Sequence, residues 1–348
     1  MEDLSLYYTP GVGDVAKSLE RCPALAHDLT IKKNTVAVVS DGSAVLGLGN
    51  IGPEGALPVM EGKAMIFKEF AGVDAFPIVL STQNPKEVVQ TILNISPGFG
   101  GINLEDIKAP ECFEIERELV KKLDIPVMHD DQHGTAIVVL AGLLNAFKVV
   151  GKNIRKSTVV IVGSGAAGIA TAKLLHKFGV GGVIVVDSKG IVHKKRKGLT
   201  PYKRDLARMT NPPVSGRLDE AILGADAVVG VSGPRRISKK QVASMGENAI
   251  VFALANPVPE IMPEDAKKAG AAVTATGRSD FPNQVNNALV FPGIFRGAFD
   301  RRVQNITDEM KIRAAKNLAG VIKKPTRDKI IPSIFDKKVM PAVSRAIK

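Results

Sequence analysis

The sequence predicts an α/β protein that contains a doubly wound parallel sheet. Two observations carry this prediction: the length of 348 residues suits two domains, and the second half alternates apolar runs with helical stretches. Each run is continuously apolar, which is typical of strands that helices cover on both faces. The expected strands cover residues 158–162, 183–186, 227–231, 249–254 and 272–275.

The first half of the chain predicts a separate N-terminal α/β domain. Glycine-rich turns interrupt it, and short apolar runs lie among helical patterns. The expected elements are strands at 36–39 and 78–80 and helices at 85–95 and 110–123.

The hydrophobic pattern changes character near residue 150, which indicates two domains. We predict an N-terminal domain over residues 1–135 and a second domain over residues 136–286. The tail over residues 287–348, rich in Ala, Ile and Lys, is expected to form helices that return to the first domain.

The composition predicts a folded cytoplasmic protein without a membrane segment. Hydrophobic residues make up 45% and charged residues 24% of the chain, near globular averages. Two cysteines, Cys22 and Cys112, are too few for a disulfide framework and suit a reducing compartment. The most apolar stretch, residues 135–147, is too short to span a bilayer, and the N-terminus lacks the features of a secretory signal.

The net charge of +12 is concentrated in the tail. Residues 301–348 hold 13 Lys and Arg against 4 Asp and Glu, an excess of 13 − 4 = +9. No aromatic residues alternate with these cations as in a stacking platform for single-stranded nucleic acid. A solvated basic helical face is therefore favoured over nucleic-acid or other polyanion binding.

A glycine-rich motif predicts a dinucleotide site in the second domain. The motif GSGAAG follows an expected strand and opens an expected helix over about 167–178. Its glycines would allow a tight turn, a close approach of the backbone to a pyrophosphate and close helix packing, and the helix N-terminus attracts phosphates. The candidate cofactor residues here are Gly163, Ser164, Gly165, Ala166, Ala167 and Gly168.

Asp187 completes this Rossmann-type pattern, 19 residues beyond Gly168 at the end of the next strand. A carboxylate there accepts hydrogen bonds from the ribose hydroxyls and would repel a 2′-phosphate, which favours NAD. Lys189 and the basic run 193–197 lie just downstream and could pair with that phosphate. Both NAD and NADP therefore stay open as the cofactor.

Two pairs of carboxylates predict a site for a hard divalent cation. Glu105 and Asp106 follow a short apolar run, and Asp130 and Asp131 precede a helix. Oxygen ligands of this kind suit Mg²⁺ or Mn²⁺. Surface solvation and helix capping are the alternatives. Adjacent side chains on a strand point to opposite faces, so Glu105 and Asp106 can share an ion only if the chain bends there.

Two histidines and a lysine are further candidates for site residues. His129 and His133 have the i, i+4 spacing of a zinc pair, but the aspartates between them disfavour that interpretation. Lys63 follows a glycine-rich stretch and precedes an apolar run, so it is a candidate for a half-buried base rather than a surface lysine.

Together these segments resemble the malic enzymes, in the short form found in bacteria and archaea. The resemblance covers nearly the whole chain. It rests on the ordered blocks LYYTPGVG, VLGLGNIGPEGALPVMEGKA, FAGVDAFPI, GFGGINLEDI, HDDQHGTAIV, GSGAAG, ALANP and FPNQVNNALVFPGIFRGA. It implies a Rossmann-type NAD(P)-binding domain and an N-terminal catalytic domain in a homodimer or higher homo-oligomer. The implied reaction is Mg²⁺- or Mn²⁺-dependent conversion of (S)-malate and NAD(P)⁺ to pyruvate, CO₂ and NAD(P)H.

The resemblance also implies a role for each motif residue. Tyr8 matches the general acid and Lys63 the general base, with Asp130 as the carboxylate paired to the lysine. The family's metal ligands correspond to Glu105, Asp106 and Asp131. Amides that contact substrate and nicotinamide correspond to Asn256 and Asn287.

Two departures from the family pattern bear on substrate binding. Ala44 stands where the large eukaryotic enzymes have an arginine that holds the malate carboxylate, so Arg278 or the asparagines are expected to replace it. Most relatives also carry a further segment ahead of the tyrosine. Its absence here could leave Tyr8 mobile or a subunit interface uncovered.

Three alternative functions compete with this one. A malolactic-type enzyme would share the site but return the hydride to form lactate. A dehydrogenase that does not decarboxylate is disfavoured by the metal carboxylates. A non-catalytic dinucleotide- or polyanion-binding module has no need of Tyr8, Lys63 and three ligand carboxylates.

Overall fold

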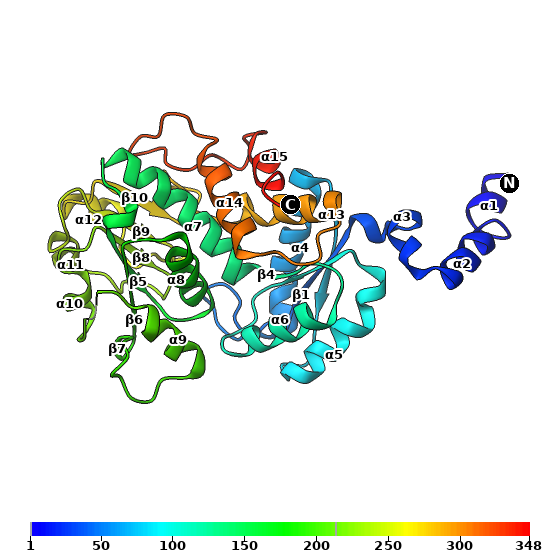
Figure 1. Ribbon diagram of the computed structural model, residues 1–348, viewed down its shortest axis with the longest axis horizontal. Coiled ribbons are helices and arrows are strands. Elements are labelled where there is room, and N and C mark those ends of the chain that lie inside the picture. The colour runs from blue at the N-terminus through cyan, green and yellow to red at the C-terminus, as the bar shows by residue number, and fades with distance from the viewer. Residues whose placement is uncertain (1, 213) are drawn as a thin grey trace.

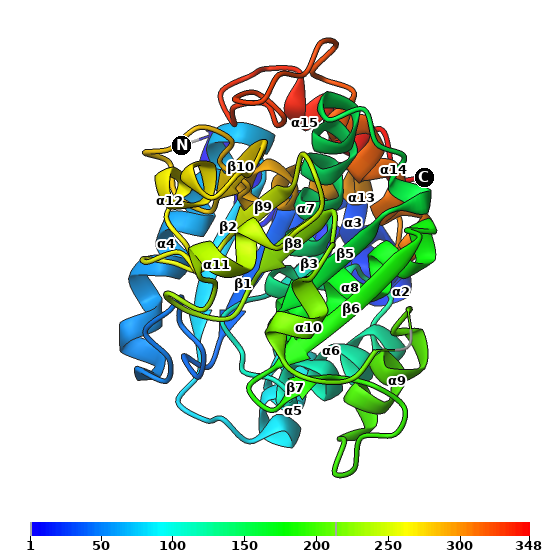
Figure 2. The same ribbon diagram turned by 90° about the vertical axis from the view of Figure 1, so that its left-hand side faces the viewer.

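The computed structural model describes residues 2–212 and 214–348, and its strands form two sheets (Figures 1 and 2). Residue 1, where the predicted N-terminal domain begins, and residue 213, in the predicted second domain, lie outside the described residues. The α/β class and the parallel sheets predicted from the sequence are confirmed.

The smaller sheet is entirely parallel and has the order β2–β1–β3–β4. Its strand β2 begins four residues earlier than the predicted run at 78–80 and includes Pro77. Proline cannot donate to the ladder, and β2 tolerates it because it lies at the sheet edge. The strands are β1 Thr35–Ser40, β2 Asp74–Val79, β3 Gly101–Leu104 and β4 Val127–His129.

The larger sheet has the order β10–β9–β8–β5–β6–β7 (Figure 2). Its first five strands are parallel and lie at the predicted runs, and β7 adds a short antiparallel edge that was not predicted. The strands are β5 Thr158–Val162, β6 Gly182–Asp187, β7 Gly190–Ile191, β8 Ala227–Gly230, β9 Ile250–Ala253 and β10 Val273–Thr276.

Helices cover both faces of the larger sheet. Alternate residues of β5 enter different cores: Val159 and Ile161 pack in one hydrophobic cluster, and Val160 and Val162 pack in the other. This separation explains why the strand is apolar at every position. The α-helices are α1 Glu2–Tyr7, α2 Val12–Arg21, α3 Ala26–Leu29, α4 Gly52–Ala71, α5 Pro85–Ile95, α6 Glu111–Lys122, α7 Asp130–Val149, α8 Ala166–Phe178, α9 Pro201–Met209, α10 Leu218–Ile222, α11 Lys239–Ala243, α12 Pro263–Lys268, α13 Phe291–Arg301, α14 Asp308–Ala319 and α15 Val339–Ser344.

Helix α7 and the C-terminal helices connect the two halves (Figure 1). The expected domain boundary at residues 135–136 lies within α7, which contacts β4 at its start and α8 and α14 along its length. Helix α13 contacts α4, and the side chain of Arg296 donates to Asn34 Oδ1 at 2.7 Å. The C-terminal tail therefore packs on elements of the smaller sheet.

The first helices extend away from this body as an N-terminal arm, residues 2–29, which Figure 1 shows at the right. None of the residues of α2 or α3 is buried. Apolar side chains of the arm are exposed, among them Leu4, Leu6 and Val12. Such a patch is typical of a surface that associates with another protein.

Within the described residues, no helix has both the length and the apolar character needed to cross a bilayer.

Replacing Asn145 should loosen the C-terminal tail. This fully buried amide on α7 donates to the carbonyl oxygens of Ala319 and Ile330, both at 2.9 Å. In Asn145→Ala these buried acceptors lose their donor, so the free energy of unfolding should fall by about 1–3 kcal/mol. Urea denaturation measures the change. The control Asn94→Ala, at an exposed α5 amide, should stay within about 0.5 kcal/mol of the wild type.

Candidate active site

The carboxyl ends of the two parallel sheets face one cleft of about 660 Å³. Ligands of open α/β sheets bind at this end of the strands. Helix α4, the start of α7 and the loops after β1, β3, β8, β9 and β10 line the cleft. Among the predicted site residues, the lining includes Lys63, Glu105, Asp106, Asp131, Ala167, Asn256 and Asn287.

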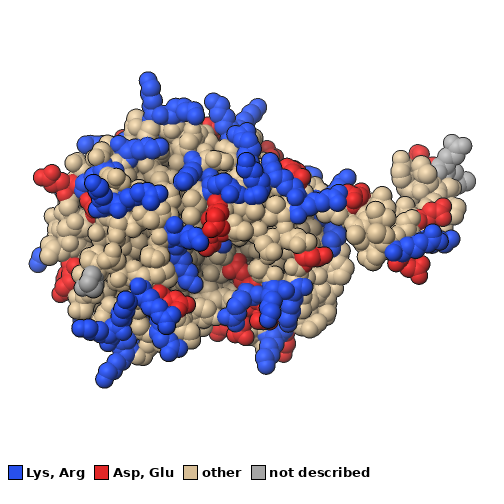
Figure 3. Space-filling model, in the orientation of Figure 1, with Lys and Arg blue, Asp and Glu red and all other residues tan. Residues whose placement is uncertain are grey.

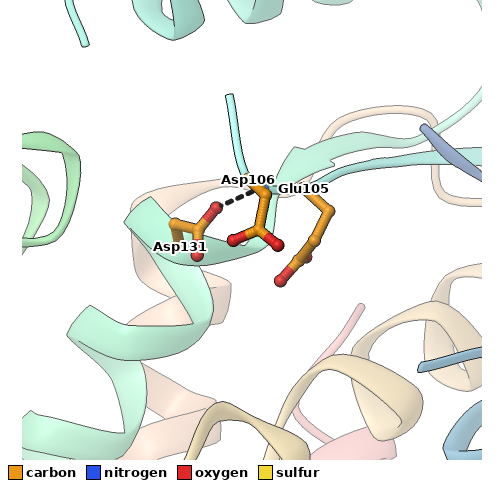
Figure 4. Close-up of side chains that lie close together, drawn as sticks. All are labelled: Glu105, Asp106 and Asp131. Carbon is orange, nitrogen blue, oxygen red and sulfur yellow. Dashed lines mark hydrogen bonds between the residues drawn. The ribbon is translucent and has the colours of Figure 1, made fainter. Parts of the chain in front are cut away.

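Three carboxylates meet on one side of the cleft (Figure 4). One oxygen from each of Glu105, Asp106 and Asp131 lies within 4.8 Å of the others. Strand β3 ends at Leu104, and Asp106 has φ 53°, so the chain bends and both adjacent side chains reach the same point. Asp131 Oδ2 accepts a hydrogen bond of 2.8 Å from the Asp106 backbone N–H, the dashed line in Figure 4.

The carboxylate cluster has the chemistry of a cation site. Glu105 and Asp106 are buried, which excludes the alternative that they are solvated surface groups. Burial and the Asp131 charge raise the pKa of Asp106 to about 7. Its Oδ2 is buried without a hydrogen-bond partner in the described structure. A Mg²⁺ or Mn²⁺ ion fits this set of oxygens, because it would satisfy the unpaired atom and offset the repulsion.

Lys63 lies next to these carboxylates on α4. Its side chain is only 7% exposed, and Nζ lies 2.7 Å from Glu105 Oε2. Nζ also donates to Asp130 Oδ2 and lies 4.2 Å from the ring centroid of Phe291. Burial disfavours the ammonium ion, but the Asp130 and Glu105 carboxylates outweigh burial and hold the pKa of Lys63 above its ordinary value. Lys63 is therefore a buried, paired lysine rather than a surface one.

The first residues of α7 do not act as helix caps. The N-cap residue is His129, and no side chain caps this helix end. Asp130 is fully buried against Lys63, and its Oδ1 has no hydrogen-bond partner in the described structure. Burial, only partly opposed by Lys63, raises the pKa of Asp130. The helix thus begins with two carboxylates turned toward different groups of one site.

His129, at the end of β4, and His133, on α7, do not form a zinc pair. His129 Nε2 lies 3.3 Å from Asp131 Oδ2, whereas His133 Nε2 lies 3.0 Å from the Glu116 carboxylate. Glu116 also accepts from the His129 backbone N–H at 2.7 Å. The His133 interaction outweighs burial and lowers the pKa of Glu116 to about 2. Glu116 was not identified from the sequence, because a glutamate within an amphipathic helix carries no signal of its distant partners.

The glycine motif forms an open turn between β5 and α8. Gly163 has φ 122°, and a Cβ at Gly168 would lie 2.0 Å from the Gly163 carbonyl oxygen. A Cβ at Gly165 would meet nothing within 4 Å. Two glycines therefore allow the turn and the close packing of α8, and the third leaves space in front of the helix N-terminus. This cradle fits the pyrophosphate of a dinucleotide.

Asp187 ends β6, and cations surround it. Its Oδ2 accepts from Arg196 at 2.8 Å and from Lys203 at 2.7 Å, and its Oδ1 accepts from the Lys189 backbone N–H at 2.8 Å. These interactions outweigh burial and lower the pKa of Asp187 to about 2. Arg196 belongs to the basic run noted in the sequence, but Lys203, on α9, was not singled out.

Arg236, rather than the expected Arg278, is the arginine among the residues that line the cleft. Arg278 forms a two-contact ion pair with Asp280, at 2.9 and 2.6 Å, and is not among the residues that line the cleft. Arg236, in the loop after β8, lines the cleft and is exposed. Two adjacent arginines after an apolar strand were a visible signal in the sequence, but nothing in the pattern distinguished which one faces the site.

Tyr8 lies apart from this constellation. It belongs to the N-terminal arm, its side chain is 64% exposed, and it is not among the residues that line the cleft. The single chain brings Lys63, Asp130 and the three carboxylates together but leaves Tyr8 outside the site.

Comparisons with known proteins agree along the whole chain. Residues 1–88 match the family model "Malic enzyme, N-terminal domain", and residues 132–347 match "Malic enzyme, NAD binding domain". The bifunctional malic/malolactic enzyme of Bacillus subtilis is 54% identical, over 99% of this chain and 85% of that protein. The NADP-dependent malic enzyme of Halomonas elongata is 45% identical, over 99% of this chain and 86% of that protein.

A solved structure has the same fold. The crystal structure of the NAD-dependent malic enzyme from Thermotoga maritima is 50% identical and superimposes with a TM-score of 0.96, covering 100% of this chain and 92% of that one. The buried lysine, the carboxylate cluster and the glycine cradle therefore occur on a backbone and in a sequence that place this chain in the malic enzyme family.

Proposed function

We propose that the protein catalyses the oxidative decarboxylation of (S)-malate to pyruvate and CO₂, with reduction of NAD⁺ or NADP⁺. The observation that carries the proposal is the contact of Lys63 with Asp130 and Glu105, beside the carboxylate cluster, in a cleft that also contains Ala167 of the glycine cradle. One cleft would therefore bring a base, a cation site and a dinucleotide site to the same bound substrate.

Two groups beyond the chain belong to this proposal. Glu105, Asp106 and Asp131 would hold Mg²⁺ or Mn²⁺, which polarises hydroxyl and carbonyl oxygens. The turn from Gly163 to Gly168 would hold NAD(P)⁺, which accepts a hydride.

Within the chain, Lys63 would remove the proton from the substrate hydroxyl at C2. It can do so only as a neutral amine, and the neighbouring carboxylates favour its charged form. Glu105 would favour that form less once its own charge is shared with a divalent cation. Asp130, which contacts Nζ directly, would orient the lysine and stabilise it after it has accepted the proton.

The amides and Arg236 would recognise the substrate and nicotinamide. Asn256 follows β9, and Asn287 opens the short turn before α13, so the two reach the cleft from different elements. Arg236, in the loop after β8, would supply the positive charge that Ala44 does not. Together they suit a small dicarboxylate.

Tyr8 would protonate C3 of the enolate that decarboxylation leaves, and we propose that a second copy of the chain supplies it. The exposed apolar residues of the N-terminal arm support a homodimer in which each arm lies on the partner. We further propose a cytoplasmic protein in which residues 1–135, with 287–348 packed on them, form the catalytic domain, and residues 136–286 form the cofactor domain.

A malolactic reaction is the second candidate. The 54% identical relative from B. subtilis is named a bifunctional malic/malolactic enzyme. In that reaction the reduced cofactor would stay bound and return its hydride to pyruvate. The same site would then release lactate instead of pyruvate.

An assay of product balance tests the proposed reaction. Purified protein with (S)-malate and Mn²⁺, given NAD⁺ or NADP⁺ in parallel, should form reduced nicotinamide and pyruvate in equal amounts, and a chelator should stop both. Lactate without net reduction would identify the malolactic reaction instead. Absence of any product with either cofactor would contradict the proposal.

Removing the Lys63 amine should stop oxidation without affecting nucleotide binding. In Lys63→Ala, malate oxidation should fall by a factor of about 10²–10⁴, because the substitution removes the amine proposed to take the substrate proton. Stopped-flow absorbance measures hydride transfer, and calorimetry measures nucleotide binding. The matched control is Lys68→Ala, on the same helix as Lys63, which breaks an exposed ion pair with Asp74 of β2 and should oxidise malate normally. Near-normal turnover by Lys63→Ala would reject the assignment.

Mixing two inactive variants tests whether Tyr8 acts across the dimer. Chains carrying Lys63→Ala and chains carrying Tyr8→Phe, co-expressed with different tags, should recover about one quarter of the wild-type rate of pyruvate formation. If the dimers form at random, half are mixed, and one of the two sites in each mixed dimer has both residues intact. If Tyr8 acts within its own chain, every site keeps one defect and no activity returns.

A further inference from the structure

At the end of β6, both carboxylate oxygens of Asp187 already accept hydrogen bonds. Asp187 is 6% exposed, and its Oδ2 is shared by Arg196 and Lys203. Its Oδ1 accepts the Lys189 backbone N–H, which closes the turn into β7. A ribose binder of the NAD type needs free carboxylate oxygens for two hydroxyl donors. Here both oxygens already accept hydrogen bonds, so the carboxylate is poorly placed for that role.

The charge at this position is positive rather than negative. Two cations contact one carboxylate, and the loop that follows adds Lys194, Lys195 and Lys197. Figure 3 shows the basic side chains gathered at the lower left, over the region that Figure 1 labels β7 and α9. Repulsion of a 2′-phosphate by Asp187, expected from the sequence, is therefore offset by its neighbours.

Arg196 and Lys203 differ in the other hydrogen bonds that their side chains make. Arg196 also donates to the carbonyl oxygens of Gly190 and Ile191, at 3.0 and 3.3 Å, so it stabilises the β6–β7 hairpin as well. The Lys203 ammonium donates to Asp187 Oδ2, and the Lys203 side chain is 27% exposed. Lys203 can therefore turn toward a ligand on a flexible stem, while Arg196 presents a fixed guanidinium.

We propose that Arg196 and Lys203 form a subsite for the 2′-phosphate of the adenosine ribose, so that the protein binds NADP⁺ more tightly than NAD⁺. Charge-assisted hydrogen bonds from a guanidinium and an ammonium match a phosphate dianion. Asp187 acts as the counter-ion that holds both cations in place when the phosphate is absent. This inference rests on the dinucleotide site of the proposed function, but not on the reaction with malate.

Binding of nucleotide fragments tests the subsite without malate or metal. By calorimetry, 2′,5′-ADP should bind the full-length protein at least about tenfold more tightly than 5′-AMP. The isomer 3′,5′-ADP has the same charge, so it should bind clearly less tightly than 2′,5′-ADP if the subsite rather than the general basic surface is responsible.

Substitutions assign the effect to the cluster. Lys203→Met should remove most of the preference for 2′,5′-ADP and leave 5′-AMP binding unchanged. The matched control is Lys152→Met, which breaks a similar half-buried ion pair with Asp226, at 2.6 Å, elsewhere on the larger sheet. It should keep the full preference.

Asp187→Asn should change 2′,5′-ADP binding in the opposite direction from Lys203→Met. Releasing both cations should tighten 2′,5′-ADP binding and leave 5′-AMP binding unchanged. Loss of 5′-AMP affinity in Asp187→Asn would mean that the carboxylate holds the ribose hydroxyls, and it would overturn the inference. Equal binding of the two nucleotides by the wild type would overturn it as well, even if malate is oxidised. Failure to bind either nucleotide would reject the dinucleotide site itself.

Discussion

The buried contact of Lys63 with Asp130 and Glu105 is the interaction on which the site depends. It joins α4, the start of α7 and the end of β3, three elements that no local sequence signal brings together. A lysine this deeply buried is tolerated because two carboxylates compensate its charge. Those carboxylates are in turn tolerated because of the lysine. Each group thus fixes the others, and the cleft is held in shape before any ligand enters.

The same arrangement explains why Glu105 and Asp106 can lie side by side in the sequence and still share one site. An extended strand would send them to opposite faces, but β3 stops at Leu104 and the backbone turns at Asp106. Asp131 fixes that turn by accepting the Asp106 backbone N–H. The geometry of the cluster is therefore stabilised by one of its own members, at the expense of crowding three carboxylates that a divalent cation would relieve.

Much of the fold followed from the sequence, and less of the site did. The continuous apolar runs predicted the larger sheet, because burial on both faces makes a strand apolar at every position. The antiparallel edge β7 was missed, since two residues are too few to show a pattern. Motifs located Lys63 and the carboxylates, but pairings such as Glu116 with His133, or Lys203 with Asp187, join side chains whose separation no periodicity encodes.

The N-terminal arm leaves apolar side chains unburied in the single chain. Fully burying a large apolar side chain is worth about 1.5–3 kcal/mol, and the arm leaves several exposed, including Leu4 and Leu6. Its helices contact little of the core that stabilises the rest of the protein. The core therefore does little to fix the position of these helices. Because the tyrosine with the proposed acid role lies on this arm, the proposed dimer would bury the arm and complete the site in one step, so that the same apolar surface would link assembly and catalysis.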